Sequence, residues 1–266
     1  MHEKERHKLI LAAVESRPVV TVTELVSMTS TSEATIRRDI ATLHLAKQVR
    51  RVRGGVESIT PPPVTGLAGR PLSVNKGINA AQKQAIANAA AALCEDGESI
   101  IINGGSTTFN MVYPLATRRL QILTNSMPIA QYLLYNSKNT ITLPGGTIYR
   151  EQDIILSPFE NDISRHFHAR RMFMGAQAIG PLGIMEADPQ IIQAEQRLIE
   201  QTDELIVLAD SSKFDKRSGL IITSLERLHT VITDENISDS AAAMLEKAEI
   251  QVIAAPLNST RSKQSS

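Results

Sequence analysis

Short apolar segments alternate with helical segments from residue 80 onward, and this alternation limits the possible folds more than any other feature. The helical pattern of AAQKQAIANAAAALC precedes the strand pattern of ESIIING, and GSTTFNMVYPL begins another expected helix. ELIVLADSS, LHTVITD, AAAMLEKA and IQVIAA continue the alternation. Short apolar strands separated by helices are typical of βαβ units. The pattern predicts an α/β domain whose largely parallel sheet is covered by helices on both faces. In such sheets ligands bind at the carboxyl ends of the strands.

A segment rich in proline, glycine and small polar residues precedes this domain. TPPPVTGLAGRPLS has few large apolar side chains, and its three consecutive prolines favour an extended backbone. We therefore expect a small helical domain over residues 1–58, a linker over 59–74, the α/β domain over 75–256 and a disordered tail over 257–266.

The composition is that of an ordinary soluble protein, with 42% hydrophobic residues and a net charge of zero. No apolar run reaches the roughly 18 residues of a membrane span. The charged start MHEKERHK also lacks a signal-peptide core, so we expect a cytoplasmic protein without a membrane partner. The single cysteine, Cys94, has no second thiol with which to bind a metal, and we expect neither a metal nor a cofactor. The basic residues within 165–171 are expected at the surface.

Three helical segments are expected near the N-terminus. Apolar spacing over residues 2–16 predicts the first, a threonine at position 21 or 23 can cap the second, and Ser32 can cap the third. The turn Thr29–Thr31 separates the second helix from the third. Two short helices joined by a tight turn form a helix-turn-helix arrangement.

The third helix has one apolar face and one polar face. At about 100° per residue, Ile36, Ile40 and Leu43 fall within about 60° of one another and form a buried stripe. The opposite face offers guanidinium groups, hydroxyls and small side chains that allow close approach to a major groove. A solvated charged face has the same pattern, so the helix alone does not decide. The candidate DNA contacts here are Ser32, Ala34, Thr35, Arg37, Arg38 and Thr42.

The segment KQVRRVRGGVE alternates valines with arginines around a glycine turn. This pattern predicts a two-stranded wing whose basic edge lies along the phosphate backbone, where contacts supply affinity and register. The candidate wing contacts are Arg50, Arg51, Arg53 and Gly54. Helix, turn, recognition helix and basic wing together predict binding to double-stranded DNA.

The stretch IIINGGSTTFN joins an apolar strand to two glycines and three hydroxyl residues. Glycines let the backbone approach an anion, while amides at a helix start and the hydroxyls of Ser106, Thr107 and Thr108 can donate to it. No Gly-Lys-Ser/Thr follows, which excludes a P-loop. A tight turn without a ligand would have the same sequence pattern.

A second candidate loop, Asp210–Lys213, follows the apolar strand LIVLA. Lys213 offers a mobile positive charge for a phosphate or carboxylate, and the serines offer hydroxyls. A solvated turn is the alternative.

The segments VTVTELVSMTSTSEATIRRDIATL and RRVRGGV resemble the winged helix-turn-helix of the DeoR family of bacterial transcriptional regulators. The resemblance continues to about Ala255 and implies a C-terminal sugar-phosphate sensor similar in fold to ribose-phosphate isomerases and sugar-phosphate deaminases. It also implies the effector-binding residues, which are Gly104, Gly105, Ser106, Thr107, Thr108, Thr124, Asn125, Ser126, Gly145, Gly146, Glu195, Asp210, Ser212 and Lys213.

Two positions depart from the family pattern. The connection His44–Gln48 lacks the glycine that the family usually has between helix and wing. Asn103, which we also count as an effector residue, replaces a common aspartate and removes a negative charge, which suits a more acidic ligand. Segments such as INGGSTTFN and LADSSKFDKRSGLI resemble the ascorbate-utilisation repressor subgroup, which implies a phosphorylated sugar acid as effector.

We therefore expect a sequence-specific DNA-binding regulator, a repressor of a carbohydrate-utilisation operon that responds to a phosphorylated sugar or sugar acid. Binding to repeated operator sites predicts a homo-oligomer, a dimer or tetramer. The alternative is a sugar-phosphate isomerase or deaminase with a DNA-binding domain, which needs a general base. Asn103 cannot serve as that base, and only Glu195 and Asp210 remain, so we expect no catalytic residues and no enzyme. A purely architectural DNA binder would leave the α/β domain without a role.

Overall fold

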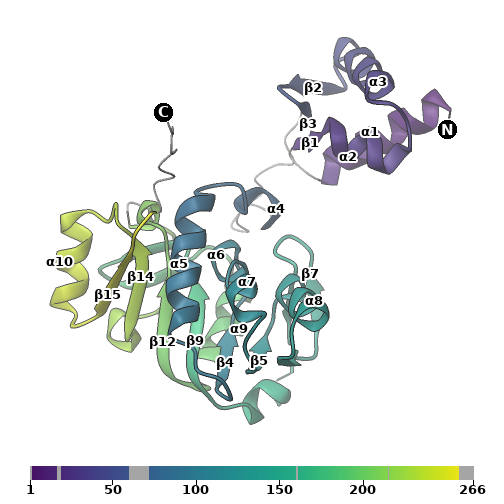
Figure 1. Cartoon of the computed structure of the whole chain (residues 1–266). Helices are drawn as coiled ribbons and strands as arrows, with labels where there is room; N and C mark the ends of the chain where they lie inside the picture. The colour runs from purple at the N-terminus through teal and green to yellow at the C-terminus, as the bar shows by residue number, and fades with distance from the viewer. Residues whose placement is uncertain (1, 17–18, 60–71, 160, 215, 258–266) are drawn as a thin grey trace, which may run out of the picture. The chain divides into compact units, whose positions relative to one another are not determined.

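The computed structural model describes residues 2–16, 19–59, 72–159, 161–214 and 216–257. The chain forms two compact units, residues 1–74 and 75–266, each of which is considered by itself (Figure 1). Most of the expected linker, and all but the first residue of the expected tail, lie outside the described residues. Within the described ranges, no helix combines the length and apolar character of a membrane span.

The N-terminal unit contains the predicted helices and wing. Its helices are α1 (Glu3–Ser16), α2 (Val22–Thr29) and α3 (Glu33–Leu45), and its strands are β1 (Val19–Thr21), β2 (Val49–Val52) and β3 (Gly55–Ser58). The hairpin β2–β3 is the predicted wing, but β1 extends it to a three-stranded antiparallel sheet in the order β1-β3-β2. A strand of three residues is too short to show an alternating pattern, so the sequence did not predict β1.

Local hydrogen bonds fix the helix starts that the sequence predicts. Thr21 caps α2 in a capping box with Glu24, and the Ser32 hydroxyl accepts from the amide of Thr35 at 3.3 Å at the start of α3. Ile36 and Ile40 of α3 are buried in the core of this unit, as their spacing predicts.

Asp39 of α3 is buried and faces α1. Its carboxylate accepts from Arg6 Nε at 2.7 Å and lies 3.3 Å from His7 Nε2. A buried carboxylate needs such partners, so Asp39 ties α3 to α1, while the two arginines that precede it, Arg37 and Arg38, are exposed.

Lys47 ends α3 in the left-handed conformation, with φ of 53°. The amide of Gln48 donates to the Leu43 carbonyl at 2.9 Å and that of Lys47 to the His44 carbonyl at 3.0 Å, which is the Schellman pattern. Glycine usually fills this position, so the glycine missing from His44–Gln48 is replaced by a lysine that adopts the same turn.

Lys47→Gly is expected to stabilise the N-terminal unit by about 0.5–1 kcal/mol. A left-handed residue with a side chain costs about 1–2 kcal/mol, which exceeds the roughly 0.5–1 kcal/mol of extra chain entropy that glycine loses on folding. Native-state hydrogen exchange of the buried α3 amides should then slow by about two- to fivefold. Lys47→Asn removes the same charge but tolerates the turn, whereas Lys47→Val should speed exchange; a valine variant that exchanges like the natural protein would contradict this account.

The second unit contains the predicted parallel sheet, and the α/β prediction is confirmed. The seven strands are all parallel and follow the order β15-β14-β12-β9-β4-β5-β6. Their bounds are β4 (Ser99–Ile102), β5 (Gln121–Thr124), β6 (Thr140–Thr142), β9 (Ala169–Gly175), β12 (Thr202–Leu208), β14 (Thr230–Asp234) and β15 (Gln251–Ala255). The main helices are α5 (Ala80–Ala92), α8 (Met127–Asn136), α9 (Pro189–Ile199) and α10 (Asp239–Lys247).

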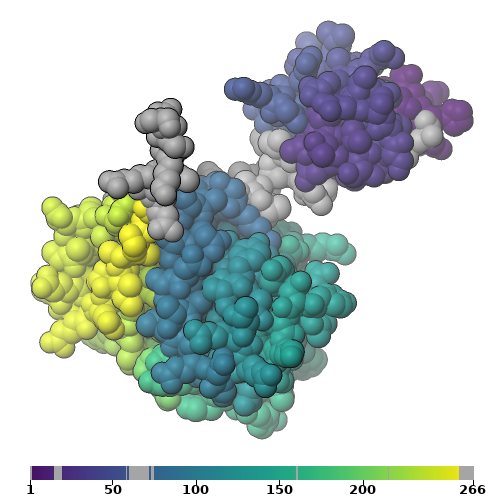
Figure 2. Space-filling model, viewed as in Figure 1, coloured from purple at the N-terminus to yellow at the C-terminus, as the bar shows by residue number. Residues whose placement is uncertain are grey.

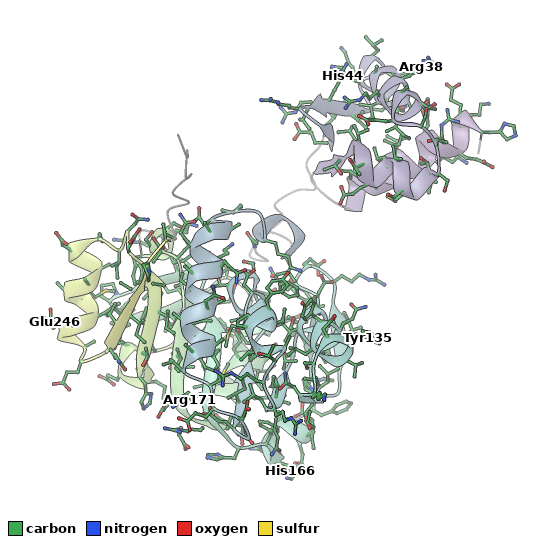
Figure 3. The ribbon with its side chains drawn as sticks, viewed as in Figure 1. Arg38, His44, Tyr135, His166, Arg171 and Glu246 are labelled. Carbon is green, nitrogen blue, oxygen red and sulfur yellow. The ribbon has the colours of Figure 1, made fainter. Side chains whose placement is uncertain are left out.

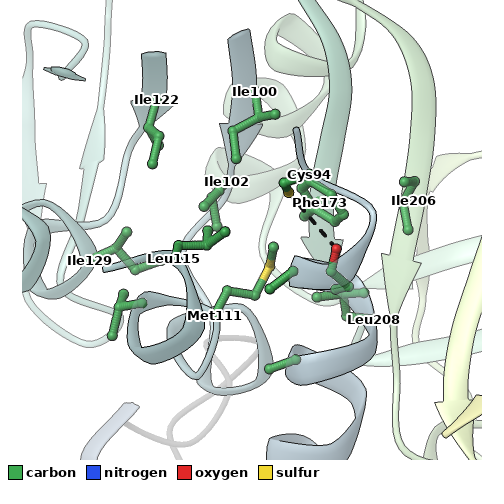
Figure 4. Packing of buried hydrophobic residues seen from close by; sticks show 14 of the residues in the cluster. Cys94, Ile100, Ile102, Met111, Leu115, Ile122, Ile129, Phe173, Ile206 and Leu208 are labelled. Atoms are coloured by element: carbon green, nitrogen blue, oxygen red, sulfur yellow. Dashed lines mark hydrogen bonds between the residues drawn. The ribbon is translucent and has the colours of Figure 1, made fainter. Parts of the chain in front are cut away.

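Each face of the sheet carries its own apolar cluster, because successive strand side chains point to opposite faces. Ile100 and Ile102 pack with α5 and α8 on one face, where Figure 4 shows them beside Phe173, Met111 and Leu115. Ile101 packs with α9 and α10 on the other face. In the space-filling view, α5 forms a continuous band between the yellow C-terminal elements and the teal region of α8 (Figure 2). Both faces are covered, as predicted.

Smaller elements that the sequence did not reveal complete the described structure. They are α4 (Leu72–Asn75), the hairpin β7 (Thr147–Tyr149) with β8 (Ile154–Leu156), the antiparallel sheet of β10 (Ala178–Gly180), β11 (Gly183–Glu186) and β13 (Leu220–Thr223), and the 3₁₀ turns η1 (Ile163–His166), η2 (Ser211–Lys213) and η3 (Leu225–Arg227).

Two expectations about the second unit were wrong. The helix expected from GSTTFNMVYPL is two single turns, α6 (Ser106–Phe109) and α7 (Val112–Leu115). Asn110 Nδ2 donates to the Ser106 carbonyl at 2.9 Å, and Pro114 has no amide with which to continue the helix. Arg171 is buried rather than solvated, because its guanidinium donates to Glu98 at 2.7 Å and to Glu204 at 2.9 Å (Figure 3).

Candidate DNA-binding surface and effector site

The outward face of α3 exposes the side chains that the sequence assigns to DNA. Arg38 is exposed, and its guanidinium makes no hydrogen bond or ion pair with any described residue (Figure 3). Arg37 is also exposed but pairs with Glu33 one turn earlier. The exposed Thr42 hydroxyl donates to the Arg38 carbonyl at 3.1 Å. Of the two arginines, Arg38 therefore has the guanidinium that needs no rearrangement to reach a base edge.

The small and hydroxyl residues at the start of α3 have two kinds of role. Ala34 is exposed and leaves room for close approach. Ser32 and Thr35 are joined by a hydroxyl–hydroxyl hydrogen bond of 2.9 Å within the helix cap. Their first role is therefore to fix the helix start, and a DNA contact would be additional.

A cleft of about 520 Å³ lies between α3 and the wing and carries three of the candidate arginines. Arg51 and Arg53 are exposed along it, without a side-chain partner in the described ranges, and Arg37 lines it from α3. The fourth wing residue, Arg50, pairs across the strands with Glu57. The cleft therefore gathers positive charge from two elements, an arrangement that suits contact with a phosphate backbone.

The two wing glycines have different structural roles. Gly54 has φ of 81°, which a turn residue with a side chain rarely adopts. A Cβ on Gly55 would lie 2.4 Å from the Val20 carbonyl oxygen, so Gly55 is needed for β1 to pair closely with β3. His44 was missed by the sequence reasoning: its Nδ1 lies 3.2 Å from the Val49 carbonyl and 3.4 Å from the Arg51 amide, and it holds the wing against α3.

In the second unit, the loop after β4 is joined to the loop after β5. The Gly104 amide donates to Asn125 Oδ1 at 2.8 Å. A Cβ at Gly104 would lie 2.2 Å from Cγ2 of Ile154, so only glycine fits there. Thr124, Asn125 and Ser126 are all buried, and Thr124 Oγ1 accepts from the Ser126 amide at 3.1 Å. Of these three residues, Asn125 holds the glycine loop directly, through the Gly104 amide.

The glycine loop itself is partly open. Gly104, Gly105 and Ser106 are half-buried, whereas Thr107 and Thr108 are buried and the Thr108 hydroxyl donates to the Gly105 carbonyl at 3.1 Å. Because α6 has only four residues, its dipole adds little to anion binding. The groups left for a phosphate are the Ser106 hydroxyl and the amides of Ser106–Thr108, which have no acceptor in the described part of the chain.

Asn103 and Glu195 form a buried pair. Asn103 Nδ2 donates to Glu195 Oε1 at 2.6 Å, and Asn103 Oδ1 accepts from the Gly175 amide at 3.1 Å. Burial, together with the nearby Glu186, raises the pKa of Glu195 to about 8. An aspartate at position 103 would place a second carboxylate against Glu195, which explains why an amide suits this chain.

The second candidate loop is held by Asp210. Its Oδ1 accepts from the Ser212 hydroxyl at 2.5 Å and from Asn79 Nδ2 at 2.9 Å. Asp210 is buried, so it supports the loop, whereas Ser212 and Lys213 are half-buried. The half-buried Lys213 is the group of this loop that can offer positive charge to a ligand.

Glu186, which sequence reasoning missed, interacts electrostatically with Glu195 and with Lys213. Burial raises its pKa to about 6, while neighbouring backbone amides and Lys213 lower it. Glu186 in turn acts on Glu195, which bonds Asn103. The structure thus brings Asn103, Glu195 and Lys213 into one electrostatically connected cluster although β9 lies between β4 and β12.

Gly145 and Gly146 follow β6 and are exposed. A Cβ on Gly146 would lie 2.3 Å from the Leu156 carbonyl oxygen, so Gly146 packs against the end of β8. Within the described residues, no hydrogen bond links either glycine to the Asn103–Glu195 pair or to the Asp210 loop. Because β6 is the edge strand next to β5, any contact that the two glycines make with a ligand would come from the end of the site opposite the Asp210 loop, which follows β12.

Other residues missed by sequence reasoning lie at the start of α5. Asn79 donates to Asp210, and Lys83 Nζ donates to the Asn75 carbonyl at 2.5 Å. Burial lowers the pKa of Lys83 to about 8. No motif marks these residues; the only signal for Glu186 is a carboxylate directly after the short apolar run Gly183–Met185. In the ranges that the structure covers, no three His, Cys, Asp or Glu side chains group to hold a metal ion.

Comparisons with known proteins agree with this division into two functions. A model of the DeoR-like helix-turn-helix domain matches residues 6–62, and a model of the DeoR C terminal sensor domain matches residues 78–235. The HTH-type transcriptional regulator UlaR of Shigella dysenteriae serotype 1 is 31% identical over 255 residues, which cover 95% of this chain and 99% of that protein. UlaR of Escherichia coli K12 gives the same values.

Among solved structures, ribose 5-phosphate isomerase A from Methanocaldococcus jannaschii matches with a TM-score of 0.39 and 17% identity, over 51% of this chain and 54% of that one. The eIF2B delta structure from Chaetomium thermophilum matches with a TM-score of 0.41 and 14% identity, over 70% of this chain and 57% of that one.

Proposed function

Because this chain belongs to the DeoR family of transcriptional regulators, we propose that it represses a carbohydrate-utilisation operon and that a phosphorylated sugar or sugar acid controls its binding to operator DNA. The observation that carries the proposal is the cluster from the glycine loop through Asn103, Glu195 and Glu186 to Lys213. It combines amides of Ser106–Thr108 that have no acceptor among the described residues with a cation, the chemistry that holds a phosphate.

For the DNA-binding unit, we propose that α3 enters the major groove and that the wing lies along the backbone. Arg38, with the exposed small and hydroxyl residues around it, would read bases, and Arg51 and Arg53 would contact phosphates. The proposed contacts are Ser32, Ala34, Thr35, Arg37, Arg38, Thr42, Arg50, Arg51, Arg53 and Gly54.

For the sensor unit, the proposed effector residues divide by burial. Gly104, Gly105, Ser106, Ser212 and Lys213 are accessible enough to touch a ligand. Most of the buried members would act by positioning them; these are Asn103, Thr107, Thr108, Thr124, Asn125, Ser126 and Asp210. Glu195 is also buried, but one of its carboxylate oxygens has no partner among the described residues. Gly145 and Gly146, which are exposed after β6, would line only the edge of the proposed site.

We further propose a cytoplasmic homo-oligomer, because a single winged unit reads one half-site and gains affinity by pairing. The domain boundaries at 58, 74 and 256 are part of the same proposal.

Catalysis by the sensor unit is the second candidate function, and one observation favours it. The pKa of Glu195, about 8, lies near the value that a general base needs. Against it, Asn103, which holds Oε1 of Glu195, is an amide and cannot act as a second acid or base beside it, and the relative that matches over 95% of this chain is a transcriptional regulator. We therefore propose binding without turnover.

A thermal-shift screen of the full chain with sugar phosphates and sugar-acid phosphates tests the proposed function. At least one compound should raise the melting temperature, and prolonged incubation should leave it chemically unchanged by NMR. Conversion of the compound would support the hypothesis that the sensor unit is an enzyme. The failure of every phosphorylated compound to stabilise the chain would refute the proposed sensor function.

A further inference from the structure

Glu195 has one carboxylate oxygen that no described residue satisfies. Its side chain is almost entirely buried, with 6% of the residue exposed. Oε1 accepts from Asn103 Nδ2 at 2.6 Å, but Oε2 is buried and has no hydrogen-bond partner among the described residues. Buried polar atoms are nearly always paired, so an unpaired one at a candidate binding site indicates a missing partner.

The charges around Glu195 disfavour its ionised form. Glu186 of β11 acts on it as a second negative charge, and Asp188 adds negative charge near Glu186. Lys213 of η2 offsets Glu186. No positive group is among the causes that act on Glu195 itself.

The described elements that pack most closely against α9 bring no cation to this carboxyl. Strands β8 and β13 have no titratable side chain, and Asp203 and Glu204 lie at the start of β12. The two basic residues of η1, Arg165 and His166, are exposed. Arg197 of α9 itself donates to the carbonyls of Ser157 and Phe159.

A neutral carboxylic acid satisfies this arrangement. Oε1 is then the carbonyl oxygen that accepts from Asn103, and Oε2 carries the proton as a donor without an acceptor. We propose that Glu195 donates this hydrogen bond from Oε2 to an acceptor oxygen of the effector's sugar part, and so selects effectors that present such an oxygen beside the phosphate-binding loop. This inference rests on the proposed sensor function and assigns Glu195 a specificity-determining role.

The expected pH dependence follows from the proton. If only protonated Glu195 binds, affinity falls as the pH rises through its pKa of about 8. From pH 7 to pH 9 the protonated fraction drops about tenfold, and so should the affinity. Lys83, whose pKa is also lowered to about 8, loses its charge over the same range, so the wild-type profile alone is not diagnostic.

Glu195→Gln separates the two effects, because glutamine keeps an acceptor for Asn103 and a permanent donor in place of Oε2. We would titrate 6-phosphogluconate and sorbitol 6-phosphate, which differ only at the end remote from the phosphate, into full-length wild type, Glu195→Gln and Glu195→Ala by calorimetry at pH 7 and 9. At pH 7 the glutamine variant should bind within about threefold of wild type, whereas the alanine variant should lose at least about tenfold. Between pH 7 and 9 wild type should lose about tenfold more affinity than the glutamine variant.

Two results would overturn the inference while leaving the sensor intact: equal pH losses in wild type and the glutamine variant, or a glutamine variant as weak as the alanine variant. If neither probe binds wild type, the same titrations are made with a compound that the thermal-shift screen identifies; if no phosphorylated compound binds, the inference falls together with the proposed function.

A ligand-free measurement tests the proton independently. The pKa of folded Glu195 lies above its ordinary value of 4.5, so its contribution to stability is complete below about pH 4.5 and is lost as the pH rises to about 8. Urea unfolding should show wild type losing stability relative to Glu195→Gln between pH 5 and 8. A constant difference over this range would mean that Glu195 ionises normally and would refute the neutral acid.

Discussion

Replacing Arg38 with alanine should weaken operator binding on the order of 10- to 100-fold for each DNA-binding unit, because a good arginine–base contact contributes about 1–3 kcal/mol of discrimination. Arg38 is exposed on the face of α3 opposite the buried stripe, and its guanidinium has no competing partner in the described residues. Fluorescence anisotropy on a duplex selected by the full-length protein from a random library measures the loss. Discrimination between this operator and unrelated DNA should fall with it.

Two control variants separate base reading from charge. Arg119→Ala removes an exposed arginine from the sensor unit and should leave DNA binding unchanged. Arg53→Ala should weaken binding to all sequences alike and reduce the salt slope by about one, as expected for a phosphate contact. If Arg38→Ala weakened binding to all sequences alike, as Arg53→Ala should, α3 would not be the element that recognises the base sequence.

The second large effect is expected at Lys213. Lys213→Ala should abolish stabilisation by any phosphorylated compound that shifts the wild-type melting temperature. At a ligand concentration about 100 times Kd, bound ligand stabilises a protein by about 2.7 kcal/mol, so the lost shift is readily measured by differential scanning calorimetry. Lys213 is the half-buried cation of the Asp210 loop and acts on Glu186, which places its charge in the proposed site.

Lys216→Ala is the matched control, since it removes an exposed lysine three residues further along the chain. It should keep the full ligand-induced shift. An unchanged shift in Lys213→Ala would remove this lysine from the site, and an equal loss in both variants would indicate a general charge effect.

Features with local causes were the ones that the sequence predicted well. The parallel sheet followed from buried apolar strands such as β4, because a strand covered on both faces has a continuous apolar run. The start of α3 followed from Ser32, whose hydroxyl acts on an amide three residues away. The glycine loop was found because Gly104 and Gly105 directly follow the apolar strand β4 and precede three hydroxyl residues. In each case neighbouring residues carry most of the information.

The parts of the site that the sequence did not predict depend on distant pairs. Asn103 is hydrogen-bonded to Glu195, which lies 92 residues later in the sequence, and Asn79 is hydrogen-bonded to Asp210, which lies 131 residues later. Glu195 sits in a helix rich in polar residues and would ordinarily be exposed, and only the packed sheet shows that it is buried. Lys47 was a similar case: the missing glycine was visible, but the lysine that adopts its conformation was not.

The central claim is that ligand binding in the sensor unit controls DNA binding, and coupling between the two is its most direct test. Operator affinity of the full-length protein should be measured by anisotropy with and without a saturating compound from the thermal-shift screen. The account predicts a change of about five- to 150-fold, the usual range of allosteric coupling, and no change in Lys213→Ala. A compound that binds wild type tightly, yet leaves its operator affinity unchanged, would contradict the account.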